Sequence, residues 1–572
     1  MTRPAKTGWH GSASLIPTGR DSTAGPAAAA ARWVRGLAAL VVLLFVTAPS
    51  AFAQLFTVNV SGTVNWTDGQ GNLHAARDDQ VQIVGDPPIG SPFIAGTAST
   101  DLNGNYTISF SSNAPGLNTY QLQVLASNPA GYVSTDATVG NTYVVPTPTF
   151  GLGSGNNTIN FNVPNNNNSQ TQSLAVVDGI LTTYQYAQDA RPAAPAPVGV
   201  RFPDTGTFFN GAISVLTSDA FDQDVVEHEY GHYLQSIDNL ANNPGGSHSW
   251  GATNIGLVQT AGGVPLSKLA GIRLAWGEGS ATFLGIASQF DNPVGHNLPT
   301  NLQNFGDTYF DDFGENVEGK VVNSSLNLAG FDVVTNTGGT IVSTQVPGQG
   351  EGDEAPVARI LWSISDTTAQ PWDRVQRGPV QVYQDLLAAA KANGGTLQTL
   401  SQVNNYYLNT VAQNDRQRTN YGAIFQHYGI SPSPTGLLST NPTLNAANPP
   451  PTFTWSAGNN GANETFNLIV WNSDPTLSTR IINNFLIPAA SGTSYTLTAA
   501  QWATVDAAPG VKEFVITGSD LMDPTGAAYA GLSATGPYWS DAYPFTVVVP
   551  EPGGLGLLVI AGLLWIRRRR VL

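Results

Sequence analysis

The chain has 572 residues, of which 41% are hydrophobic and only 11% are charged, and it contains 61 Gly and 38 Pro. This composition excludes a coiled coil or a helical bundle, and the length predicts several domains that contain many short strands and turns. The formal net charge is −16 and Cys is absent, which argues against nucleic-acid binding and leaves His, Asp and Glu as the side chains that could hold a metal.

Residues 1–53 are typical of a secretory signal peptide. Arg32 and Arg35 precede an apolar run at residues 37–46, and small residues at Ala51 and Ala53 follow the run. We expect cleavage after Ala53 and export of the remaining chain. A membrane anchor is the alternative, although the apolar run is short for a membrane span.

Residues 54–163 alternate between apolar and polar side chains, as at Tyr106, Ile108 and Phe110, and Asn-Gly turn sequences separate the runs. A period of two predicts antiparallel strands. The stretch at residues 96–110 resembles the transthyretin-like domain of the carboxypeptidase-regulatory family, which implies an N-terminal β-sandwich. A polar linker is expected at residues 164–170.

Residues 171–431 change to a helical period, which predicts a central α+β domain. Val357, Ile360 and Ile364 fall on one helical stripe, and Gly394 and Gly429 stand where helices are expected to end.

The chemistry of this domain is indicated by His228-Glu229-Tyr230-Gly231-His232, an H-E-x-x-H pattern. Residues four apart lie on one face of a helix, so both imidazoles can bind one zinc ion. Glu229 lies beside them, where its carboxylate can accept a proton from a zinc-activated water that attacks a carbonyl group. We expect Ser218 or Asp219 to cap this helix, and Ile237 to lie on its core-facing stripe.

A third ligand is required, and Glu278 is the best candidate because it is an acidic residue within an apolar helical stretch. Pairing of Glu278 with Arg273 is the structural alternative. Asp238 is a rival ligand, because the metzincin pattern places its third ligand there. That pattern needs a turn-making glycine where this chain has Gln235.

These residues resemble the metal site of gluzincin-type zinc metallopeptidases, the group of thermolysin and fungalysin. The resemblance implies a zincin-like domain with His228, His232 and Glu278 as zinc ligands and Glu229 as general base. It implies a secreted or surface-associated endopeptidase that acts on a protein or peptide substrate. A non-catalytic zincin-fold protein of the cell surface or biofilm matrix, or a zinc hydrolase of non-peptide substrates, remains an alternative.

Two further groups of side chains are candidates for roles in the site. Donors to a developing oxyanion could be Tyr309, Tyr421, His427 and Tyr428. Calcium is a second candidate cofactor, with possible ligands at Asp307, Asp311, Asp312, Glu351, Asp353 and Glu354, although their spacing favours a solvated surface.

Residues 445–549 return to strands after a proline-rich break, and a fibronectin-like or Ig-like β-sandwich is expected there. Trp455 and Trp539 are expected to be packing residues, with an aromatic binding platform as the alternative.

Residues 550–572 join Pro550-Glu551-Pro552 to an apolar segment at residues 553–566 and four arginines. This order resembles a PEP-CTERM sorting signal, which implies a Gram-negative bacterium, processing by an exosortase and transient membrane association through a transmembrane helix. A plain tail anchor is the alternative. Either reading predicts that the body of the protein is exported to the cell surface or beyond, since the arginines stay in the cytoplasm.

Overall fold

The structure is a computed structural model of the chain. It describes residues 55–113, 116, 118–165, 169–246, 268–290, 333–337, 340–344, 350–366, 372–437, 443–445, 449–458, 465–520 and 535–548. The expected signal peptide and sorting signal lie outside these residues. The chain divides into two compact units, Met1–Phe56 and Thr57–Leu572, and the elements below belong to the second unit apart from the first residue of β1.

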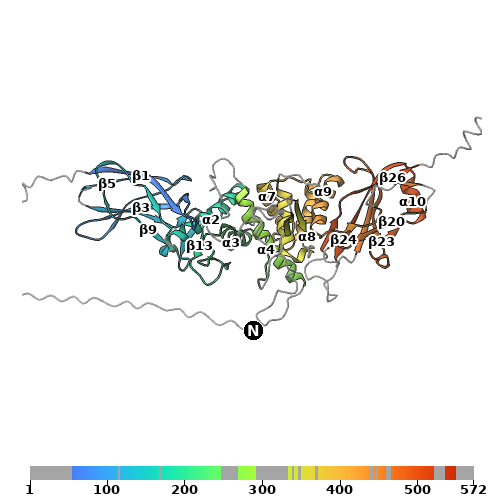
Figure 1. Cartoon of the computed structure of the whole chain (residues 1–572), viewed down its shortest axis with the longest axis horizontal. Coiled ribbons are helices and arrows are strands. Elements are labelled where there is room, and N and C mark those ends of the chain that lie inside the picture. The colour runs from blue at the N-terminus through green and yellow to red at the C-terminus, as the bar shows by residue number, and fades with distance from the viewer. Residues whose placement is uncertain are drawn as a thin grey trace, which may run out of the picture. The chain divides into compact units, whose positions relative to one another are not determined.

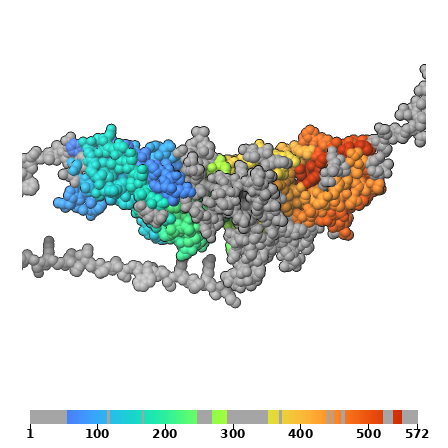
Figure 2. Space-filling model, viewed as in Figure 1, coloured from blue at the N-terminus to red at the C-terminus, as the bar shows by residue number. Residues whose placement is uncertain are grey.

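Two five-stranded sheets form the N-terminal region, whose strands β1, β3, β5 and β9 are labelled in Figure 1 and whose atoms are blue to cyan in Figure 2. The first has the order β11-β1-β12, with β2 and β5 also paired to β1, and the second has the order β10-β6-β3-β4, with β9 paired to β6. The strands are β1 Phe56–Thr67, β2 Leu73–Ala75, β3 Gln80–Asp86, β4 Phe93–Ser99, β5 Asn105–Ser112, β6 Thr119–Leu125, β9 Val144–Pro146, β10 Phe150–Gly151, β11 Gly155–Thr158 and β12 Phe161–Val163.

The predicted alternation places the core of these sheets correctly. Tyr106 and Ile108 are buried while Thr107 and Ser109 between and after them are exposed. The expected turn before β5 is also present, and Gly104 adopts a φ of +75° that favours glycine.

A third sheet, of order β14-β15-β13-β8-β7, draws strands from both sides of the polar segment 164–170. Its strands are β7 Ser127–Asn128, β8 Gly131–Ser134, β13 Val198–Arg201, β14 Phe208–Phe209 and β15 Ile213–Ser214, and a 3-10 turn, η1, spans Val139–Asn141. β13 pairs in parallel with β8 and with β15, so residues far apart in the sequence share one sheet. Among the strands that the structure describes, β14 pairs with β15 alone and lies at the edge of this sheet.

Helices make up most of the described residues between 169 and 427. They are α2 Ser169–Ala190, α3 Gln223–Asp238, α4 Lys268–Phe290, α6 Glu354–Ser365, α7 Pro379–Ala392, α8 Leu400–Tyr406 and α9 Asp415–His427, with short turns η3 Gly350–Gly352 and η4 Tyr407–Val411 and a hairpin of β16 Val333–Thr337 and β17 Thr340–Thr344. The predicted stripe on α6 is buried, and Gly394 and Gly429 follow the ends of α7 and α9 with φ of +80° and +73°.

Two local predictions for the H-E-x-x-H helix are wrong. α3 is capped by Asp222, whose carboxylate accepts a hydrogen bond from the Val225 N–H at 3.2 Å, and Ser218 and Asp219 precede it. Ile237 is 37% exposed, so the buried stripe of α3 stops short of it, one residue before the helix ends. Among the helices that the structure describes, none is both long and apolar enough to cross a membrane.

The C-terminal region is again built of strands. Its sheets have the orders β18-β20-β23 and β19-β26-β24-β21-β22, with β25 also paired to β24. The elements are β18 Ser433–Pro434, β19 Thr443–Asn445, β20 Thr452–Ser456, β21 Thr465–Asn472, β22 Arg480–Ile487, η6 Ala489–Ser491, β23 Ser494–Thr496, α10 Ala499–Asp506, β24 Gly510–Asp520, β25 Thr535–Trp539 and β26 Tyr543–Val548. Trp455 and Trp539 are buried, which confirms the packing role and argues against a binding platform. The broader prediction of several domains built from β-sheets and helices is thus confirmed.

A buried ion pair fastens the N-terminal strands to the helices. Arg77, which follows β2, donates from Nε to Asp178 Oδ1 on α2 at 2.7 Å and from Nη2 to Thr182 Oγ1 at 2.8 Å. Both charged side chains are only 1% exposed. A charge that loses its partner in such a place cannot be solvated by water, so each charge depends on the other.

We therefore expect Arg77→Ala to lower the free energy of unfolding by about 3–5 kcal/mol, because Asp178 would be left buried without its cation. The matched control is Arg374→Ala, which removes a bidentate pair with Asp541 in which the arginine is 42% exposed. That control should cost no more than about 1 kcal/mol. Urea denaturation followed by circular dichroism measures both, and equal losses would contradict the assignment.

Candidate metal centre

The site depends on a close approach of α3 and α4. A Cβ atom on Gly231 would lie 2.6 Å from the Ala281 carbonyl oxygen, and one on Gly285 would lie 3.0 Å from the Glu227 backbone. A distance of 2.6 Å is shorter than a Cβ atom can approach a carbonyl oxygen. Glycine at residue 231 therefore allows the two helix backbones to come into contact. This contact brings the histidine face of α3 against the acidic residue of α4.

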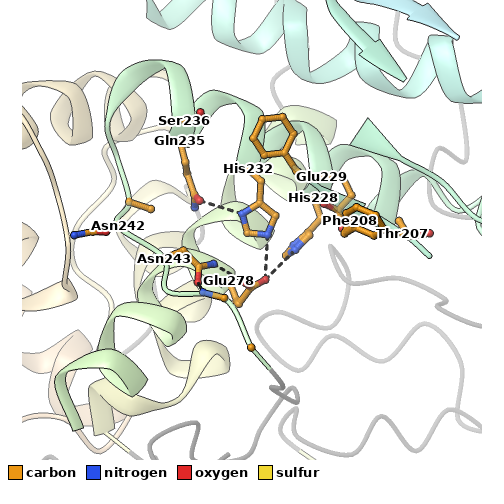
Figure 3. Close-up of a pocket in the computed structure, with 14 residues that line it drawn as sticks. Thr207, Phe208, His228, Glu229, His232, Gln235, Ser236, Asn242, Asn243 and Glu278 are labelled. Carbon is orange, nitrogen blue, oxygen red and sulfur yellow. Dashed lines mark hydrogen bonds and ion pairs between the residues drawn. The ribbon is translucent and has the colours of Figure 1, made fainter. Parts of the chain in front are cut away.

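Three side chains converge where the helices meet (Figure 3). Glu278 Oε2 lies 3.4 Å from His228 Nε2 and 3.0 Å from His232 Nε2. Ligand atoms on these three residues all lie within 4.8 Å of one another, and the group could hold a metal ion. Tetrahedral zinc with bonds of about 2.0–2.2 Å separates its nitrogen and oxygen ligands by about 3.4 Å, so the donor set and its spacing both fit zinc.

The Nδ1 atom of His228 faces Thr282 Oγ1 at 3.0 Å. The single hydroxyl proton of Thr282 goes to the Glu278 carbonyl oxygen, also at 3.0 Å. The hydroxyl oxygen must therefore accept from His228, which places a proton on Nδ1. In the neutral ring this leaves the Nε2 lone pair directed toward Glu278 and available to a metal.

His232 is oriented in the same way by a residue one turn further along α3. Its Nδ1 lies 3.1 Å from Gln235 Oε1. The Gln235 amide nitrogen donates to the Gly277 carbonyl oxygen at 2.6 Å and to Ser280 Oγ at 2.8 Å, so Oε1 is the acceptor for His232. Both ligand rings are thus held by neighbours that leave Nε2 facing inward, as partners of metal-binding histidines typically do.

His232 and Glu278 each stabilise the charged form of the other. Burial alone would lower the pKa of His232, but the adjacent Glu278 carboxylate outweighs burial and raises the pKa to about 9. Burial would raise the pKa of Glu278, yet the charge of His232, its hydrogen bond to Oε2 and the adjacent His228 imidazole hold that pKa well below its usual 4.5. Glu278 is therefore an anion at neutral pH, which is the form that binds a cation.

A pocket of about 610 Å³ opens onto the three side chains. Glu229, only 6% exposed, contributes to its lining next to His228 (Figure 3). The remaining lining residues are uncharged and come from β14 with the residue before it, from the last turns of α3 and from the loop after α3: Thr207, Phe208, Phe209, Gln235, Ser236, Ala241, Asn242, Asn243, Gly245 and Gly246. The four site residues proposed from sequence thus share one pocket.

The rival ligand Asp238 lies elsewhere. Its Oδ1 is 2.9 Å from Arg191 Nη2, and its Oδ2 accepts a hydrogen bond from the Tyr383 hydroxyl at 2.6 Å. α3 continues as a helix through Gln235, where the metzincin pattern requires a turn. Asp238 is an ion-pair residue of the helical core, and the metzincin arrangement is not present.

Three of the proposed oxyanion donors, Tyr421, His427 and Tyr428, are absent from the described residues that line the pocket. His427 stacks on Trp372 with ring centroids 3.7 Å apart, and Tyr421 stacks on Tyr407 at 4.8 Å. The Tyr428 hydroxyl bonds to Ser363 at 3.0 Å. These three are packing residues, and Tyr309 lies outside the described residues.

The acidic group at the start of α6 is buried, so the expectation of a solvated surface is wrong. Glu351, Asp353 and Glu354 are at most 3% exposed. Asp353 caps α6 by accepting from the Ala355 N–H, and burial raises its pKa to about 7. Glu351 accepts a hydrogen bond from the Tyr538 hydroxyl. Within the residues that the structure describes, one group of three such side chains could hold a metal ion, at His228, His232 and Glu278. The other candidate calcium ligands, Asp307, Asp311 and Asp312, lie outside those residues.

Sequence reasoning missed the residues that orient the ligands. Thr282 and Gln235 hold the two imidazoles, and Asn243 contacts Glu278. Gln235 could have been suspected from its position three residues after His232, which places it one turn away on the same face. Thr282 stands four residues after Glu278, on the same face of α4, which is a signal of the same kind. Asn243 carries no such signal, because its role depends on the contact between separate segments.

No model of a known protein family matches the chain, and no curated protein matches it. Among solved structures, it is similar to a 9R-lipoxygenase from Cyanothece at 12% identity and a TM-score of 0.13, over 28% of this chain and 32% of that one. It is also similar to a candidate carbohydrate-binding protein from Pseudomonas aeruginosa at 14% identity and a TM-score of 0.12, over 19% of this chain and 90% of that one. The match spans about a third of the lipoxygenase, and neither similarity defines the fold or function of this chain.

The geometry predicts that Glu278→Ala removes a metal ligand while Asp238→Asn does not. The first variant should lose zinc affinity by orders of magnitude, because two imidazoles remain without the carboxylate. The asparagine in the second variant can still accept from Tyr383, and its zinc affinity should stay near that of the wild type. Competition with a chromophoric chelator measures both, and the reverse ranking would restore Asp238 as the ligand.

Zinc uptake should also release a proton. Without metal, His232 with a pKa of about 9 carries a proton on Nε2 at neutral pH, and a metal must displace it. From about pH 7.5 to about 9 the zinc affinity should therefore rise roughly tenfold per pH unit, and it should level off above that range. Calorimetry in two buffers of different ionisation enthalpy counts the proton, and binding heats that do not depend on the buffer would contradict this protonation state.

Proposed function

We propose that this protein is a secreted or surface-associated zinc-dependent endopeptidase of the gluzincin type. One observation carries the proposal: two histidines and a glutamate present Nε2, Nε2 and Oε2 to one point, beside a second glutamate in the same pocket. A donor set of two imidazoles and one carboxylate is the kind that leaves a further position on zinc for water or substrate.

The residues of the site have distinct roles in this proposal. His228, His232 and Glu278 would hold the zinc ion, which when bound supplies Lewis-acid activation of water and of a carbonyl group. Glu229 follows His228 on α3 and lies in the pocket beside the ligands, so its carboxylate would take the proton of the attacking water and pass it to the departing amine. Thr282 and Gln235 keep the imidazoles in the tautomer that binds metal.

The described lining of the pocket favours cleavage within a chain over removal of a C-terminal residue. The charged side chains of the described lining belong to the metal centre itself, and the walls consist of aromatic, amide, hydroxyl and small residues. A carboxypeptidase needs a cation to pair with the terminal carboxylate of its substrate, and this lining offers neither Lys nor Arg. An internal, uncharged backbone segment suits the pocket better.

Export and surface sorting complete the proposal. The signal-peptide pattern at residues 1–53 and the tripartite ending at residues 550–572 support secretion, processing by an exosortase and transient association with a membrane. The strongly acidic chain favours a polypeptide substrate over a nucleic acid. The flanking β-sheet regions resemble sandwich domains of the transthyretin-like and fibronectin-like or Ig-like kinds, and they would position the enzyme or bind partners.

The deciding experiment is Glu229→Gln. This change keeps the shape of the side chain but removes the base, so zinc content and thermal stability should match the wild type while casein cleavage falls by about 10²–10⁴-fold. The wild-type activity should disappear with a chelator and return with added zinc.

The alternative functions give different results in the same assays. A zinc-loaded wild type that cleaves no protein substrate would favour the non-catalytic surface protein or a hydrolase of other substrates. Loss of zinc from Glu229→Gln would instead make Glu229 a ligand or a structural residue.

A further inference from the structure

The loop after α3 returns across the metal centre and is held at its first residues. Asn239 ends α3 in the left-handed region, with a φ of 54°. Leu240 is buried, and its carbonyl oxygen accepts a hydrogen bond from Trp276 Nε1 on α4 at 2.7 Å. The loop is therefore fixed to α4 two residues before the position of Glu278.

Asn243 in this loop contacts the glutamate ligand directly. Its Nδ2 donates to Glu278 Oε1 at 2.7 Å, and its Oδ1 accepts from the Gly245 N–H at 2.8 Å (Figure 3). The second bond settles the orientation of the amide, because the oxygen faces the loop and the nitrogen must face Glu278. Asn243 thus engages Oε1, while Oε2 faces the two histidines.

The sequence of α4 leaves room for this contact. A Cβ atom at Gly277 would lie 2.7 Å from Asn243 Nδ2 and 2.9 Å from Asn243 Cβ. Any side chain at residue 277 would therefore push Asn243 away from Glu278. A glycine inside a helix is less favourable than alanine by about 1 kcal/mol, and here close packing against Asn243 explains its presence.

We propose that Asn243 is a positioning residue that makes Glu278 a ligand through one oxygen and thereby adapts the site to a four-coordinate metal. The inference rests on the proposed zinc site. A carboxylate with both oxygens free can chelate a metal, as calcium and other oxygen-preferring cations favour, whereas zinc in a tetrahedral site takes one oxygen. The hydrogen bond from Asn243 stabilises the one-oxygen arrangement, in the way that outer-shell partners tune ligands elsewhere.

Two variants remove this contact by independent routes. Asn243→Ala deletes the amide, and Gly277→Ala displaces it without changing Glu278 or the loop sequence. Asn242→Ala is the matched control, since Asn242 is an exposed residue of the same loop and pocket. Alanine favours the helix at residue 277, so the second variant tests the contact without weakening α4 through helix propensity.

The readouts are zinc affinity by chelator competition and the visible spectrum of the cobalt(II)-substituted protein, with circular dichroism to establish folding. Wild type and Asn242→Ala should show the intense bands of four-coordinate cobalt. Asn243→Ala and Gly277→Ala should show weaker bands of higher coordination, and their zinc affinity should fall about 10–100-fold. A merely structural role would lower stability or metal content without changing the spectrum of the bound ion.

The results distinguish a failure of this inference from a failure of the proposed function. Spectra and affinities of Asn243→Ala and Gly277→Ala that match the wild type would overturn the role of Asn243 and leave the zinc site intact. The same shift in Asn242→Ala would overturn it as well, because the effect would then belong to the loop in general. A wild type that takes up neither zinc nor cobalt would overturn both the proposed function and this inference.

Discussion

The contact between α3 and α4 is the constraint on which the site depends. Gly231 and Gly285 lack side chains where the helix backbones approach, so His232 and Glu278 reach each other at 3.0 Å. A larger residue at 231 would move α4 outward and separate the ligands, whatever the chemistry of the ligands themselves. Gly279 plays a related part on another side of α4, where an added Cβ would lie 2.5 Å from the Glu354 carbonyl oxygen of α6. α4 is therefore closely packed against both α3 and α6 through its glycines.

Around this contact, hydrogen bonds and opposite charge restrict the conformations of the side chains in the site. An anionic carboxylate that is only 9% exposed is costly unless opposite charge or donors surround it, and Glu278 has two imidazoles on Oε2 and an amide on Oε1. Thr282 and Gln235 in turn hold the imidazoles from behind. Ligands that are held before a metal arrives lose little conformational entropy when it binds, which raises affinity.

The regions that flank the helices are fastened to them by charges and by a shared core. Arg77 of the N-terminal strands is buried against Asp178 of α2, and a parallel pairing of β8 with β13 places residues from both sides of the polar segment in one sheet. On the C-terminal side, Arg416 pairs with Glu513 at 2.6 Å, and Tyr538 of β25 donates to Glu351 before α6. The flanking strands thus contact the helices that carry the candidate metal centre or that pack against it.

The sequence alone determined the local chemistry, because helical spacing and burial cost act within short segments. The positions of His228, Glu229 and His232 follow from a period of 3.6 residues, and Glu278 stood out as a charge within an apolar stretch. The same kind of reasoning placed Ile237 in the core and the acidic group near Glu351 on the surface, and both were wrong, since exposure depends on what else packs nearby. Tertiary structure decided that Asp238 belongs to Arg191, and that Thr282 and Asn243 serve the ligands. These roles arise where two segments meet at distances that only the packing of whole helices sets, and no pattern within either segment encodes the meeting.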